Sequence, residues 1–159
     1  LLVEAMAHVK TPVRLRLCGK SGHPGYGEAL QARIADLQLS DRIAFENRWI
    51  SEEEKADLLA GALAVAYLPH DEDSYGYPSL EAAHALKPVI TATDSGGVLE
   101  LVEDDRNGFI VEPEPKAIAA AFDRLWRDKA TAARLGAGNL QRLSDMTINW
   151  DHVVETLTA

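Results

Sequence analysis

The residues whose types are best suited to binding or catalysis lie in an acidic loop and the segment that follows it, residues 71–82. Pro78 suits the first turn of a helix, where no amide hydrogen is needed, and Gly76 permits a tight turn just before it. Backbone amides at such a helix start point outward and bind phosphate or sulfate readily. The segment therefore predicts an anion site made by main-chain amides near Gly76, Tyr77, Ser79 and Leu80.

Two carboxylates flank this predicted anion site, Asp73 in the loop and Glu81 one turn inside the helix. A carboxylate accepts two hydrogen bonds from a vicinal diol, and a similar acid-to-ribose contact serves dinucleotide-binding folds. We therefore interpret both acids as acceptors for sugar hydroxyls. Two alternatives stay open: charges that stabilise the positive end of the helix, and a hard-cation site made of Asp71, Glu72 and Asp73.

These residues must be positioned by an alternation of strands and helices along the chain. Apolar runs predict strands at residues 13–18, 42–45, 63–68, 88–91 and 109–111. Helical spacing predicts helices over residues 30–37, 78–86, 118–125, 130–143 and 150–157, and Ser51 with Glu54 forms a capping box that starts another. The alternation predicts an α/β domain with a parallel sheet, whose ligands bind beyond the carboxyl ends of the strands. The loops expected to carry the site are residues 19–24, 46–50, 69–77 and 92–97.

Composition limits the classes of function. The 159 residues suit one domain, and no apolar run approaches the roughly 18 residues of a membrane span. The net charge of −9, without a stripe of Lys or Arg, argues against a nucleic-acid surface. The single Cys18 is interpreted as a small core residue, and the cytoplasm is the expected compartment. We also expect Trp126 and Trp150 in the core. Because Leu1 stands where a helix is already under way, the chain is expected to be an excised domain.

The segment Asp73-Ser74-Tyr75-Gly76, followed after four residues by Glu81-Ala82, resembles the signature of family-4 retaining glycosyltransferases. That signature has two acids separated by seven residues, with Gly-Phe-Gly after the first. Further matches follow in the same order along the chain. They are Gly19, Lys87-Pro88-Val89-Ile90, Asp94-Ser95-Gly96-Gly97 with Glu100, and Asn107-Gly108-Phe109.

The resemblance implies a Rossmann-like three-layer domain with a parallel sheet, the C-terminal half of a GT-B fold. Residues 1–159 would form one nucleotide-sugar-binding domain, with the N-terminal acceptor domain lying outside it. The donor would be a nucleoside-diphosphate sugar, used without a metal ion or cofactor, and the acceptor is unknown. Carried over, Glu81 holds the ribose and Asp73 the donor sugar. Backbone of Tyr75, Gly76 and Tyr77 contacts the sugar or phosphate, Gly19 lets the main chain approach the donor, and Arg48 and Trp49 are weaker candidates. From their places on the ligand-side loops, Lys20 is a candidate to replace part of the missing positive charge, and His23 and His70 are candidates to touch the donor.

The sequence departs from the family pattern in ways that bear on activity. Asp73 is one methylene shorter than the usual Glu, and Ser74 and Tyr75 stand where Gly and Phe are usual. The Arg and Lys that bind the donor in the family would precede Leu1. We therefore expect this chain alone to bind donor weakly and to transfer no sugar. Two alternative hypotheses remain. The chain could be a non-catalytic nucleotide-binding or interaction module, or a relative of nucleotide-sugar epimerases or phosphorylases. A peripheral position at the inner membrane face is an option for the full-length protein.

Overall fold

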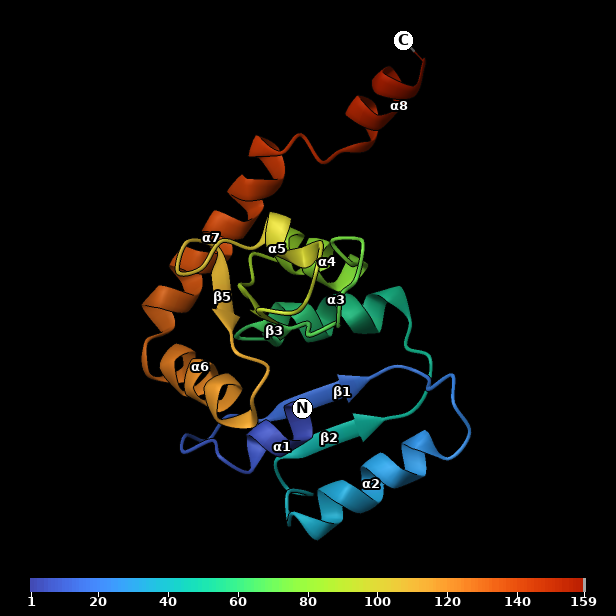
Figure 1. Ribbon diagram of the computed structural model, residues 1–159, viewed down its shortest axis with the longest axis vertical. Helices are drawn as coiled ribbons and strands as arrows, with labels where there is room; N and C mark the ends of the chain where they lie inside the picture. Colours follow the sequence, from blue (N-terminus) through green and yellow to red (C-terminus); the bar gives the residue numbers. More distant parts are fainter. Residues whose placement is uncertain (159) are drawn as a thin grey trace.

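The strands form two parallel groups in the computed structural model, which describes residues 1–158 without the side chain of Trp150 (Figure 1). One group pairs β1 (Leu15–Cys18) with β2 (Ile43–Glu46). The other contains β3 (Val65–Ala66), β4 (Val89–Ala92) and β5 (Gly108–Val111), with β4 in the centre. The expectation that Trp150 belongs to the core lies outside the described residues.

Helices connect successive strands and cover the sheets, which makes a three-layer α/β arrangement (Figure 1). Their bounds are α1 (Leu2–Met6), α2 (Tyr26–Asp36), α3 (Glu52–Gly61), α4 (Tyr77–His84), α5 (Val98–Leu101), α6 (Pro115–Arg127), α7 (Lys129–Asp145) and α8 (Trp150–Thr158). The predicted capping box is confirmed, because Ser51 accepts from the Glu54 amide at 3.1 Å and Glu54 accepts from the Ser51 amide at 2.9 Å. Helix α8 extends away from the rest of the chain, and the described side chains in it are exposed (Figure 1).

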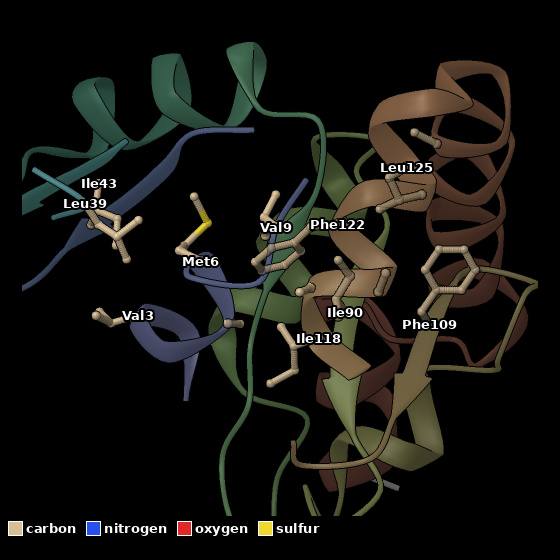
Figure 2. Packing of buried hydrophobic residues seen from close by; sticks show 14 of the residues in the cluster. Val3, Met6, Val9, Leu39, Ile43, Ile90, Phe109, Ile118, Phe122 and Leu125 are labelled. Atoms are coloured by element: carbon tan, nitrogen blue, oxygen red, sulfur yellow. The ribbon is translucent and has the colours of Figure 1, made fainter. Parts of the chain in front are cut away.

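The main core lies between β4, β5, α1 and α6. Met6, Ile90, Ile118 and Leu125 are almost fully buried there, and Figure 2 shows their side chains among those of the neighbouring elements. The buried carboxylate of Asp123 fastens the residues after α1 to α6, since it accepts from the Thr11 amide at 2.9 Å, the Thr11 hydroxyl at 2.6 Å and the Lys10 amide at 3.1 Å. The core therefore fixes α1 and β1 against the second half of the chain.

The structure differs from the sequence-based expectation in the sheet. One sheet was expected, whereas β1 and β2 form a pair that is separate from β3, β4 and β5. The predicted strand over 63–68 shortens to Val65–Ala66. The Val65 amide donates to the Pro88 carbonyl and the Tyr67 amide to the Ile90 carbonyl, each at 3.0 Å. Trp126, expected in the core, is only half-buried. The short helix α5 was not expected from the sequence.

Candidate functional site

The predicted site loops follow the carboxyl ends of four strands. Gly19 follows β1, residues 47–50 follow β2, residues 67–76 follow β3 and residues 93–97 follow β4. The first two loops are joined by the Ser21 amide, which donates to Asn47 Oδ1 at 2.8 Å. This is the edge at which open parallel sheets place their ligands.

The acidic loop is held in place by the glycine loop after β4. The Asp71 amide donates to the Asp94 carbonyl at 2.8 Å, and the Gly97 amide donates to the Glu72 carbonyl at 2.6 Å. Gly96 has a φ of 71°, and a Cβ there would lie 2.3 Å from the Glu72 carbonyl oxygen. The Gly96-Gly97 pair is therefore needed for the close approach that sets the backbone path leading to Asp73.

The turn before α4 depends on Gly76. Its φ is 68°, in the left-handed region that disfavours side chains, and a Cβ would lie 2.2 Å from the ring carbon Cε1 of Tyr67. The Ser79 hydroxyl closes the turn by donating to the Gly76 carbonyl at 2.7 Å and to the Tyr75 carbonyl. The backbone of Tyr75, Gly76 and Tyr77 is thus presented by a built turn rather than a loose loop.

Most of the amides expected to be available at this helix start donate within the chain. The Ser79 and Leu80 amides donate to the Gly76 carbonyl at 3.2 and 3.5 Å, and the Gly76 amide donates to the Ser74 hydroxyl at 3.3 Å. Among the four, the Tyr77 amide is the one with no acceptor in residues 1–158. The cause is the tight turn itself, which directs its own carbonyl at the amides of Ser79 and Leu80. The predicted cluster of four outward amides is therefore wrong in this conformation.

The two flanking carboxylates lie in different settings. Asp73 is exposed in its loop, whereas the Glu81 side chain is 32% exposed and meets a lysine of α3. Lys55 Nζ lies 2.7 Å from Glu81 Oε1 and 2.9 Å from Glu52 Oε2. The hydrogen bond to Glu81, then that to Glu52, raises the pKa of Lys55 above its usual value. Lys55 is thus a cation at neutral pH and neutralises the carboxylate expected to bind ribose.

Arg48 is already committed to two acids. Its guanidinium lies 2.8 Å from Glu54 Oε1 and 2.6 Å from Glu46 Oε2, and the hydrogen bond to Glu54, then that to Glu46, raises the pKa of Arg48. The hydrogen bond from Arg48, then that from the Ser51 amide, lowers the pKa of Glu54 to about 2. Fewer of the five N–H groups of Arg48 therefore remain to bind a sugar donor. The adjacent residue Trp49 is 79% exposed, which is unusual for so large an apolar residue.

Gly19 and Lys20 begin the loop after β1. Gly19 has a φ of 140°, and the space where its Cβ would stand holds no other atom within 4 Å. Lys20 is exposed. No other part of the described chain therefore occupies the space beside the main chain at Gly19.

Sequence reasoning did not identify Lys55, which the structure places beside Glu81. The partner of Lys55, Glu81, is 26 residues away, and no spacing rule links the two positions.

The alternative of a cation site has no support in the part of the chain that the structure describes. Within residues 1–158, no group of three or more His, Cys, Asp or Glu side chains is arranged to hold a metal ion, so Asp71, Glu72 and Asp73 do not form one here. His23 and His70 are exposed on the ligand-side loops. None of the described helices is both long and apolar enough to cross a membrane.

Comparison with known proteins shows one consistent family. Residues 1–142 match the model of the glycosyl transferases group 1 family. The chain is 35% identical over 130 residues to the alpha-1,3/1,6-mannosyltransferase ALG2 of Dictyostelium discoideum, covering 76% of this chain and 30% of ALG2. It is 32% identical over 159 residues to the D-inositol 3-phosphate glycosyltransferase of Xylanimonas cellulosilytica, covering 99% of this chain and 37% of that protein. The chain thus spans about a third of the length of these relatives.

Solved structures give the same fold. The Anabaena protein Alr3699/HepE, crystallised in complex with UDP, matches 99% of this chain and 44% of its own chain, with a TM-score of 0.83 and 28% identity. Sucrose-phosphate synthase of Thermosynechococcus elongatus matches with a TM-score of 0.83, 24% identity, 99% of this chain and 39% of its own. The second likeness supports the fold alone.

Proposed function

Since the chain belongs to the glycosyl transferases group 1 family, we propose that it is the part of a retaining glycosyltransferase that binds a nucleoside-diphosphate sugar. One observation carries this proposal: the turn fixed by Gly76 presents Tyr75 to Tyr77 at the ligand edge and leads into the helix that bears Glu81. The complex of HepE with UDP, in a chain of the same fold, supports a nucleotide as the ligand.

The proposed roles follow from the chemistry of each group. Glu81 accepts hydrogen bonds from ribose hydroxyls, and Asp73 accepts them from the donor sugar. The Tyr77 amide and the backbone from Tyr75 to Gly76 contact phosphate or sugar, since that amide has no acceptor among residues 1–158. Gly19 lets the main chain approach the donor, and the exposed Trp49 ring offers a stacking face for the base.

Most positively charged side chains in this site are already paired with carboxylates. As the sugar transfers, charge builds on the leaving diphosphate, and donors aimed at that charge lower the barrier. Arg48 is paired with Glu46 and Glu54, and Lys55 with Glu81 and Glu52, which leaves Lys20 as the exposed cation in the first loop. We propose that transfer needs cations from residues of the full-length protein other than these 159, and that no metal ion replaces them. A further domain would bind the acceptor, in the cytoplasm.

The direct test is the affinity of Glu81→Gln for UDP, ADP and GDP, measured by titration calorimetry. A charge-assisted ribose contact is worth about 1.5–3 kcal/mol, so the dissociation constant of the preferred nucleotide should rise about 10- to 150-fold. Glu114→Gln, at the exposed start of α6, is the matched control and should leave it unchanged. Equal affinities of the Glu81→Gln and parent chains would remove Glu81 from the site.

A non-catalytic nucleotide-binding or interaction module is the second candidate. The observation that favours it is the internal use of three of the four amides at the start of α4, which leaves little to hold a diphosphate. If none of the three nucleoside diphosphates binds at millimolar concentration, even to the full-length protein, the interaction module becomes the better account.

A further inference from the structure

The amides at the start of α4 differ in the kind of acceptor that they use. The Ser79 and Leu80 amides donate to the Gly76 carbonyl, which the turn itself fixes in place. The Gly76 amide donates instead to a side-chain oxygen, the hydroxyl of Ser74, at 3.3 Å. A side chain can rotate away from an amide while the backbone stays unchanged, whereas a carbonyl of the turn cannot. Of these three amides, that of Gly76 is therefore the one that an incoming ligand can free.

The hydrogen bond from the Gly76 amide to Ser74 is weak enough to exchange. Its length of 3.3 Å lies beyond the range of about 2.7–3.2 Å that is usual for N–H donors to oxygen. Ser74 is exposed, so its hydroxyl can turn toward water when it leaves the amide. Exposed side chains change rotamer within nanoseconds or less, so this exchange adds no slow step to binding.

The carboxylate of Glu72 sets the direction of the Ser74 hydroxyl. Ser74 Oγ donates to Glu72 Oε1 at 3.3 Å, which directs the hydroxyl hydrogen at the acid and leaves a lone pair for the Gly76 amide. The Glu72 backbone is fixed in turn, since its carbonyl accepts from the Gly97 amide at 2.6 Å. The chain of hydrogen bonds from Gly76 through Ser74 to Glu72 therefore keeps an oxygen atom in front of the Gly76 amide.

We propose that Ser74 is a specificity-determining residue of the donor site, because its hydroxyl occupies the Gly76 amide until an anionic oxygen of the ligand replaces it. A hydrogen bond to a charged oxygen is roughly twice as strong as one between neutral groups. A phosphate oxygen therefore gains free energy by displacing the Ser74 hydroxyl, whereas a sugar hydroxyl only exchanges one neutral acceptor for another. This role rests on the proposed function, and it makes the Gly76 amide selective for the diphosphate of a nucleotide sugar.

The test compares Ser74→Ala with the parent chain in the binding of a nucleoside diphosphate and of its nucleoside. The nucleoside carries the same base and ribose without the anion, and NMR titration measures the dissociation constants of both up to the millimolar range. The preferred diphosphate among UDP, ADP and GDP should bind Ser74→Ala about two- to twelvefold more tightly, since no hydroxyl competes for the Gly76 amide. The affinity of the nucleoside should stay the same within about twofold, which a general change in the structure of the turn would not allow.

Two further variants serve as controls. Ser74→Thr keeps a hydroxyl at the same position and should bind the diphosphate as the parent chain does. Ser40→Ala, which changes an exposed serine between α2 and β2, should alter neither affinity. An equal or weaker affinity of Ser74→Ala for the diphosphate would overturn the role of Ser74 and leave the proposed function standing.

A second measurement needs no ligand. Exchange of the Gly76 amide hydrogen with water, followed by NMR, should be about two- to twelvefold faster in Ser74→Ala than in the parent chain, because the amide loses its acceptor. Equal exchange rates would show that Ser74 does not hold this amide, and would overturn its role whatever the chain binds. Faster exchange without binding of any of the three nucleoside diphosphates at millimolar concentration would overturn the proposed function, and the role of Ser74 with it.

Discussion

Lys55 Nζ of α3 lies 2.7 Å from Glu81 Oε1 of α4, and this ion pair ties α3 to the helix that follows the acidic turn. Both side chains are about one-third exposed, so the pair is accessible to solvent and to a ligand. A ribose that binds Glu81 must either displace Lys55 or share the carboxylate with it. The pair therefore sets how much of the Glu81 contact a nucleotide gains.

Replacing Lys55 should reveal which of these holds. Partly exposed ion pairs contribute about 0–1 kcal/mol, so Lys55→Met should free Glu81 and tighten UDP binding up to about fivefold in calorimetric titration. Lys116→Met, on the exposed face of α6, is the matched control. Weaker binding by Lys55→Met would mean that the lysine contacts the nucleotide itself, since a competitor cannot lower affinity when it is removed.

Gly76 should tolerate no side chain. In Gly76→Ala the methyl group meets the Tyr67 ring and the residue keeps a positive φ, so we expect a loss of about 2–4 kcal/mol in the free energy of unfolding. Urea denaturation measures it. The double substitution with Tyr67→Ala should cost less than the sum of the two single changes, because the clash is gone.

Strict additivity in that cycle would show that Tyr67 does not limit the turn. Gly22→Ala is the control, because Gly22 has no atom within 4 Å of a Cβ and no positive φ. Its free energy of unfolding should stay within about 0.5 kcal/mol of the parent chain.

Much of the fold was predictable because its determinants are local. The Ser51 and Glu54 capping box starts α3 where expected, and the apolar runs locate β1, β2, β4 and β5 within two residues or so. The break in the sheet was not predictable, since the apolar run 63–68 resembles any buried strand and says nothing about its neighbours. Strand pairing is set by partners distant in sequence.

The candidate site, like the fold, was predictable in its local features and not in its long-range contacts. Turn chemistry at Gly76 and the loops at the strand ends could be read from residue types. The pairing of Lys55 with Glu81, and of Arg48 with Glu46 and Glu54, depends on how α3 sits beside α4 and β2. The direction of the Ser79 and Leu80 amides depends on the exact turn, which composition leaves free.

Sugar transfer should need more than this chain. Residues 1–159 span 30% of the ALG2 relative and 37% of the D-inositol 3-phosphate glycosyltransferase relative, and Arg48 and Lys55 of this chain are paired with acids. We therefore expect no transfer from UDP-glucose or GDP-mannose by the purified chain. A radiolabelled-donor assay measures this. In the full-length protein, Asp73→Asn should lower turnover more than nucleotide affinity if Asp73 contacts the donor sugar. Detectable transfer by residues 1–159 would contradict the first expectation, and a change confined to UDP affinity the second.

Asp123 should give the stability of the fold a defined acid dependence. Burial raises the pKa of this carboxyl, but hydrogen bonds from the Thr11 hydroxyl and from the Lys10 and Thr11 amides outweigh it, so the pKa is lowered. A lowered folded pKa stabilises the fold above the unfolded value of about 4, and that stability is lost as pH falls through the folded pKa. At pH 6, Asp123→Asn should cost about 2–3 kcal/mol, as expected for lost hydrogen bonds to a charged group.

The difference between the parent chain and Asp123→Asn should shrink as pH falls from about 6 to about 2.5, because protonation makes the parent carboxyl resemble the amide. Urea denaturation at several pH values measures both. Asp36→Asn, an exposed change at the end of α2, is the control and should show no such convergence. A constant difference across this range would mean that Asp123 acts by packing rather than by charge, and that the link between Thr11 and α6 does not depend on ionisation.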